Sequence, residues 1–128
     1  MPDNPPRPTA AELDLLTVLW SLGPSTVREV HETLNRRKPA QYSTVLKFLQ
    51  IMTDKGLVRR NEKQRAHVYQ AARTREWTQR QLAGDLLQRA FDGSAKSLML
   101  GALSASKASK AELAEMRRLL DEYEKRTR

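Results

Sequence analysis

Apolar residues recur every three or four positions over residues 9–22, which predicts an amphipathic helix. Thr9 and Glu12 have the spacing of a capping box, in which the two side chains bond to backbone N–H groups left free at a helix start. Gly23-Pro24 ends this pattern, and a second capping box opens a short helix over residues 26–34. Two helices are therefore expected, separated by Gly23-Pro24.

A third helix is expected after the basic turn at residues 36–40, with Ser43 or Thr44 as its N-cap and Gly56 at its end. Its apolar positions fall on one face, at Val45, Phe48, Leu49 and Met52. The opposite face is polar and includes short side chains that suit a groove-reading helix, namely Ser43, Thr44, Lys47, Gln50 and Asp54.

Two strands are expected next, at residues 57–60 and 66–69, joined by the polar connection 61–65. Three helices followed by a basic hairpin is the order of a winged helix-turn-helix, in which the third helix enters the major groove. The predicted fold is mainly α, with a winged helix-turn-helix DNA-binding domain over residues 9–73 and a small β-hairpin wing. Residues 1–8 contain four of the six prolines and are expected to form a disordered arm.

From residue 74 onward the pattern becomes helical, and Ser94 and Ser109 are expected to cap two further helices, the latter in a capping box with Glu112. Three short helices in about 55 residues bury too little surface to form a core of their own. We therefore expect residues 74–128 to be a dimerisation region that pairs with a second copy. The apolar residues expected in this interface are Trp77, Leu86, Leu87, Phe91, Leu98, Met99, Leu113, Met116, Leu120 and Tyr123.

Charge and composition narrow the function. The chain has 23 Lys and Arg residues and 15 Asp and Glu residues, and the resulting net charge of +8 favours a polyanionic partner. It has no cysteine, and neither His31 nor His67 has the spacing of a metal site, so we expect no metal or cofactor. The alternative is a metal site that His31 or His67 forms with Asp or Glu across a dimer. No phosphate-binding loop or nucleophile motif is present, so an enzyme is not expected. An apolar leader and a membrane-spanning stretch are also missing, which favours a cytoplasmic protein.

The expected contacts to double-stranded DNA come from the third helix and the wing. Lys47 would donate to guanine O6 and N7 or to phosphate, and Thr44 would bond phosphate or touch a thymine methyl. Leu46 would touch a thymine methyl or, in the favoured interpretation, pack beneath the wing; Tyr42 would bond phosphate or pack against the second helix. The full set is Tyr42, Ser43, Thr44, Leu46, Lys47, Arg59, Arg60, Lys63 and Arg65.

Three stretches carry a family resemblance: Thr-Ala-Ala-Glu-Leu-Asp-Leu-Leu-Thr-Val-Leu-Trp at 9–20, Thr-Val-Arg-Glu-Val at 26–30, and the stretch from Tyr-Ser-Thr-Val-Leu-Lys to Lys-Gly-Leu-Val at 42–58. In these the chain resembles the penicillinase-repressor family of BlaI, MecI and CopY-type bacterial regulators. The resemblance implies a homodimer on a dyad operator that represses antibiotic- or stress-response genes.

The resemblance also implies that the repressor is inactivated by proteolysis, which a membrane sensor-protease system controls. In the family the cut falls in the short helix of the C-terminal region, which here places the cleavage region at Gly101 and Ala102. CopY-type members sense copper through paired cysteines, so the absence of cysteine excludes that route.

A different class of function also fits the same pattern. A winged-helix domain can use its basic surface to bind protein or RNA and its helical tail for assembly, without sequence-specific DNA recognition. Preference for a dyad DNA site distinguishes the repressor from this alternative.

Overall fold

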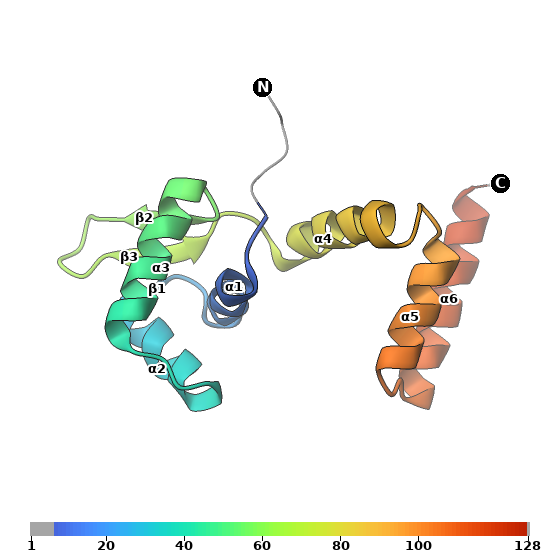
Figure 1. Ribbon diagram of the computed structural model, residues 1–128, viewed down its shortest axis with the longest axis horizontal. Helices are drawn as coiled ribbons and strands as arrows, with labels where there is room; N and C mark the ends of the chain where they lie inside the picture. The colour runs from blue at the N-terminus through green and yellow to red at the C-terminus, as the bar shows by residue number, and fades with distance from the viewer. Residues whose placement is uncertain (1–6, 128) are drawn as a thin grey trace, which may run out of the picture. The chain divides into compact units, whose positions relative to one another are not determined.

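The computed structural model describes residues 7–127, so residues 1–6 of the expected arm and Arg128 lie outside it. Within that range the mainly α prediction is confirmed, with helices and a small antiparallel sheet typical of a winged helix (Figure 1). The elements are α1 (Ala10–Leu22), β1 (Ser25–Thr26), α2 (Val27–Arg37), α3 (Tyr42–Lys55), β2 (Val58–Asn61), β3 (Val68–Ala71), α4 (Arg75–Ala90), α5 (Ala95–Ala105) and α6 (Lys110–Arg126).

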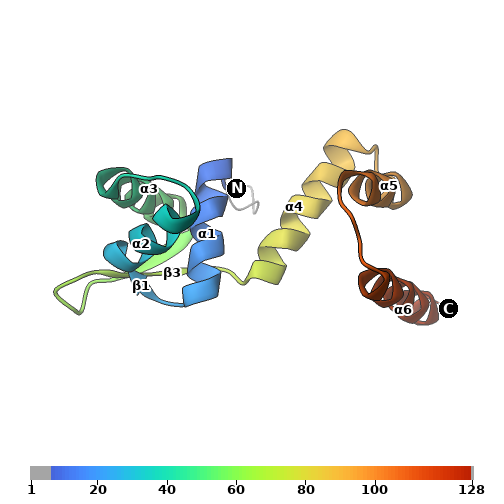
Figure 2. The ribbon, with the colours of Figure 1, turned by 90° about the horizontal axis from the view of Figure 1, so that it is seen from below.

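The chain divides into two compact units, one ending at Leu82 and one beginning at Ala83, which we call the head and the tail. In the head, α1, α2 and α3 contact one another, and α1 also contacts β3 (Figure 2). One apolar core joins these elements, made of Leu15, Leu16, Val18, Leu19, Val27, Val30, Val45, Leu49, Met52, Val58 and Tyr69. The first two turns of α4 also belong to the head, beyond the expected domain limit at residue 73.

The sheet has the strand order β1-β3-β2, with both pairs antiparallel. Both hairpin strands begin later than the sequence pattern indicated, by one residue for β2 and two for β3. In β3, Tyr69 is buried and pairs with Ser25 on one side and Arg60 on the other, so it lies inside the strand and not at its end. We call β2, β3 and their connection, residues 62–67, the wing.

The capping boxes at the starts of α1 and α2 are confirmed. The N-cap expected for α3 was wrong: the helix begins at Tyr42, and Gln41 is its N-cap without a side-chain cap bond. The Val45 N–H donates to the Gln41 carbonyl at 3.1 Å, which places Ser43 and Thr44 within the first turn. Their hydroxyls are therefore not used to start the helix.

The tail contains the rest of α4 together with α5 and α6. Ser94 and Ser109 cap the last two helices by accepting bonds from Ser97 N–H and Glu112 N–H, at 3.1 and 3.0 Å. The reciprocal half of the box, from Glu112 back to Ser109, is not formed. None of residues 79–127 is buried, and the tail helices contact one another only sparsely. The apolar stripes of the tail therefore remain accessible to a partner.

Candidate nucleic-acid interface

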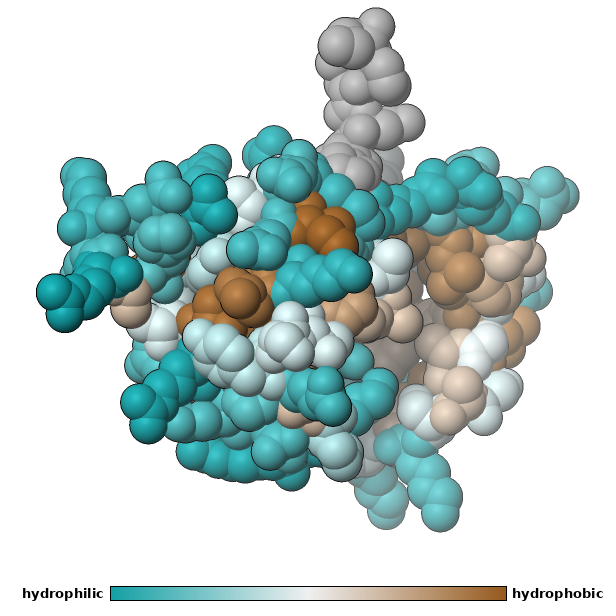
Figure 3. All heavy atoms as spheres, turned by 60° about the vertical axis from the view of Figure 1, so that its left-hand side comes forward, coloured by the Kyte–Doolittle hydropathy of each residue, from teal (hydrophilic) through white to brown (hydrophobic). Residues whose placement is uncertain are grey.

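The two faces of α3 separate as the sequence pattern predicted. Val45, Leu49 and Met52 are buried in the head core. On the opposite face Ser43, Thr44, Lys47, Gln50 and Asp54 are all exposed. Figure 3 shows one face of the molecule, on which hydrophilic residues predominate and hydrophobic patches lie among them. One side of α3 thus holds the helix in place and leaves the other side free to meet a ligand.

Tyr42 and Leu46 lie at the border between these faces. Leu46 is half-buried and packs against the head core. The Tyr42 ring packs edge-on against His31 of α2, with centroids 5.8 Å apart, while almost half of its surface stays exposed. The His31 Nε2 in turn bonds to the Ala40 carbonyl at 2.7 Å, so this contact holds the turn that aims α3.

The expected wing cations do not share one environment. Arg59, Lys63 and Arg65 are exposed, and within residues 7–127 they form no ion pair, which is also true of Lys47 on α3. Arg60 is different, because its Nη2 lies 3.2 Å from Glu62 Oε1. A hydrogen bond to Tyr69, followed by the charge of Glu62, raises the pKa of Arg60 above its already high value. Arg60 therefore braces the wing, while its neighbours are available to phosphate.

A buried ion pair connects the start of α1 to the end of α3. Lys55 Nζ donates to Glu12 Oε2 at 2.9 Å and to Oε1 at 3.1 Å, and the Glu12 side chain is only 2% exposed. Burial raises the pKa of Glu12, but bonds from the Thr9 backbone and Lys55, with the charge of Lys55, outweigh it. The pKa of Glu12 therefore lies below its ordinary value, and the carboxylate stays charged at neutral pH.

A second contact joins α1 to the first turn of α4. The Trp20 Nε1 donates to the Arg73 carbonyl at 3.0 Å, and the guanidinium of Arg75 lies 5.9 Å from the centroid of the Trp20 ring. The Arg73 guanidinium in turn lies 4.7 Å from the centroid of the Trp77 ring. Trp77, expected in the dimer interface, thus contacts the head of its own chain, and the start of α4 is attached to that head.

Three residues of the free α3 face were not among the expected DNA contacts, namely Gln50, Ile51 and Asp54. Gln50 and Ile51 lie one turn beyond Lys47, and both are exposed. The helical spacing of 100° per residue was sufficient to place Ile51 beside Thr44 and Lys47. Sequence reasoning passed over it because an isoleucine in a helix is usually assigned to the buried face.

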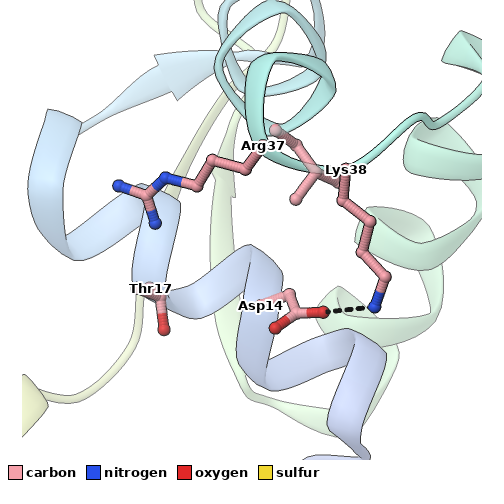
Figure 4. A pocket seen from close by; sticks show the side chains of 5 residues that line it. Asp14, Thr17, Arg37 and Lys38 are labelled. Carbon is pink, nitrogen blue, oxygen red and sulfur yellow. Dashed lines mark hydrogen bonds and ion pairs between the residues drawn. The ribbon is translucent and has the colours of Figure 1, made fainter.

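Residues 7–127 also bear on three other possibilities, a ligand pocket, a metal site and a membrane-spanning helix. A shallow pocket between α1 and α2 is lined by Asp14, Thr17, Leu34, Arg37 and Lys38, and Lys38 Nζ lies 3.4 Å from Asp14 Oδ2 across it (Figure 4). No group of three or more His, Asp or Glu side chains in this range is arranged to hold a metal ion. No helix in it has the length and apolar character needed to cross a membrane.

Comparison with known proteins gives one consistent result. A family profile described as penicillinase repressor matches residues 8–122. The chain is also 37% identical over 83 residues to the transcriptional regulator BlaI of Mycobacterium tuberculosis, in strains CDC 1551 and H37Rv. This similarity covers 64% of the chain and 60% of each relative, so it spans less than two thirds of their length.

Proposed function

Because this chain belongs to the penicillinase repressor family, we propose that it is a transcriptional repressor that binds a dyad DNA operator as a homodimer. The observation that carries the proposal is the free face of α3, where exposed Lys47 stands without an ion pair within residues 7–127. A helix held on one side and polar on the other suits the major groove.

In the proposed complex the two parts of the interface have different tasks. Lys47 reads guanine through O6 and N7, and the hydroxyls of Ser43 and Thr44, which are free of a capping role, bond phosphates at the groove edge. The exposed wing cations neutralise phosphates and carry no sequence information. These cations are Arg59, Lys63 and Arg65.

The unburied tail supports dimerisation. An exposed apolar stripe on α6 includes Leu119, Leu120 and Tyr123, which are 55–65% exposed in the single chain. An apolar stripe of this kind marks a surface that another protein surface covers. A second copy of the same tail, related by twofold symmetry, supplies such a covering surface. Two heads held in this way would enter major grooves about one helical turn, roughly 10 bp, apart.

Repression would follow from occupancy of the promoter, which excludes polymerase. On the family relationship we further propose that the regulated genes belong to antibiotic or stress response and that a membrane sensor-protease system releases the repressor by cutting α5. Gly101 and Ala102 are exposed, and α5 has no buried residue to resist local opening. A cut there separates α6 from the head, so it removes part of the proposed dimer interface. Mass spectrometry of the chain from induced cells tests this, because cleavage elsewhere or none at all contradicts it.

The first experiment is an electrophoretic mobility shift on the protein's own promoter and on random DNA, from low to physiological salt. We expect a promoter preference that survives at physiological salt, with two chains per site. Equal binding to both DNAs that disappears with salt would leave only charge-driven binding. The alternative of a protein- or RNA-binding module would then be the better explanation.

A further inference from the structure

Ile51 is an apolar side chain on the polar face of α3. The Ile51 side chain is 38% exposed. Its neighbours on that face, Thr44, Lys47 and Gln50, are all hydrophilic. Ile51 follows Lys47 by four residues and Thr44 by seven, so the three side chains form one row along the helix.

The head core does not account for Ile51. The residues of α3 that are buried in the core are Val45, Leu49 and Met52, and half-buried Leu46 and Phe48 pack against it. Ile51 belongs to neither group. The exposed part of its side chain is therefore apolar surface that the folding of the head leaves in water.

We infer that Ile51 contacts the 5-methyl group of a thymine, so that the third turn of α3 selects an A·T pair. The inference rests on the proposed function, because it requires α3 to lie in the major groove. In that groove thymine alone presents a methyl group, and an aliphatic side chain is the group that recognises it. Lys47 lies on this face and the adjoining strand β2 carries exposed Arg59, and these two cations fit DNA as the occupant.

The position of this thymine follows from helix geometry. One helical turn rises 5.4 Å, whereas stacked base pairs are spaced by about 3.4 Å. The thymine should therefore lie about one to two base pairs from the pair that Lys47 contacts. The same position occurs in both halves of a dyad site.

The test removes the methyl group from the DNA and the side chain from the protein. The preferred site of the full-length chain is first selected from random DNA, and each thymine in it is then replaced by deoxyuridine in both half-sites. We expect one position at which this replacement weakens binding by about tenfold, since each half-site loses the burial of one methyl. The Ile51→Ala chain should bind the thymine and deoxyuridine sites equally, whereas Ile51→Val, the matched control, should keep most of the discrimination.

The failures of the two proposals are distinguishable. If a preferred site is found but no thymine-to-deoxyuridine replacement in it has an effect that depends on Ile51, the inference is overturned. The repressor proposal then remains intact. Random DNA that yields no preferred site overturns both. A change in the monomer–dimer equilibrium of Ile51→Ala without DNA, seen by analytical ultracentrifugation, would show that a second copy covers this side chain and would also overturn the inference.

Discussion

Replacing Lys55 by methionine tests the buried ion pair that connects α1 to α3. Methionine keeps most of the aliphatic stem but removes the ammonium group that bonds to both oxygens of Glu12. The Glu12 carboxylate, 2% exposed, then lacks its cation, and the last turn of α3 loses a charge that suits the helix dipole.

The size of the effect follows from burial. Removing one partner of a fully buried pair costs about 3–5 kcal/mol. Here the Lys55 side chain is 35% exposed and the Thr9 N–H still bonds to Glu12 at 2.9 Å, so solvent and backbone replace part of the interaction. We expect a loss of about 2 kcal/mol in the free energy of unfolding, which for a unit of this size is roughly 8–16 °C in Tm.

The pH dependence gives a second readout. The pKa of Glu12 is lowered in the folded state, so its contribution to stability is complete above the unfolded pKa of about 4.3. That contribution disappears as the pH falls through the lower folded-state pKa. In Lys55→Met the same carboxyl becomes easier to protonate, because burial is no longer opposed by a cation. The stability difference between the two proteins should therefore narrow in acid.

The assay is urea unfolding of the full-length chain at a fixed concentration, followed by tryptophan fluorescence. The chain has two tryptophans, Trp20 and Trp77, and both lie in the head, so the signal reports on the unit that holds the ion pair. The double variant Glu12→Gln with Lys55→Met should recover much of the stability, since no buried charge remains. Equal stability of wild type and Lys55→Met at pH 7, or a difference unchanged at pH 3, would refute the reasoning.

Other expected outcomes concern the DNA and dimer surfaces. Lys47→Ala should weaken operator binding by about 1–3 kcal/mol and random DNA much less; an equal loss on both would rule out base reading. Arg59→Ala should weaken all sequences alike and flatten the slope of log K against log salt by about 0.9 per phosphate, measured by titration at several salt concentrations. Arg60→Ala should instead lower the Tm of the head by removing the brace to Tyr69, and a normal Tm with a reduced salt slope would contradict that role. Leu120→Asp should give monomers in analytical ultracentrifugation, whereas Ala114→Asp on the opposite face of α6 adds the same charge and should leave the dimer intact.

Features set by neighbouring residues were predictable from the sequence. The capping boxes at Thr9 and Thr26 depend on side chains three positions apart, and both form as predicted. The faces of α3 follow from helical periodicity in the same way. The start of α3 was not predictable, because hydroxyl groups at 43 and 44 have good capping chemistry and only the backbone path selects Gln41.

Features that depend on distant partners were missed for a different reason. The roles of Arg59 and Arg60 are indistinguishable in the sequence, and they separate only because Arg60 pairs with Tyr69 across the sheet. Likewise the bond from Trp20 to the Arg73 carbonyl joins residues 53 positions apart. β1, with two residues, is too short to produce an alternating pattern and exists because β3 pairs with it.

The exposed apolar surface of the tail also has a consequence for the dependence of regulation on the cellular concentration of the protein. None of residues 79–127 is buried within one chain, so in the proposed dimer the covering of the tail and the formation of the repressor would be one concentration-dependent step. Below the dimer dissociation constant, the amount of dimer rises with the square of the chain concentration. A twofold fall in synthesis would then reduce the operator-binding form about fourfold, so regulation would respond to gene dosage more steeply than to affinity.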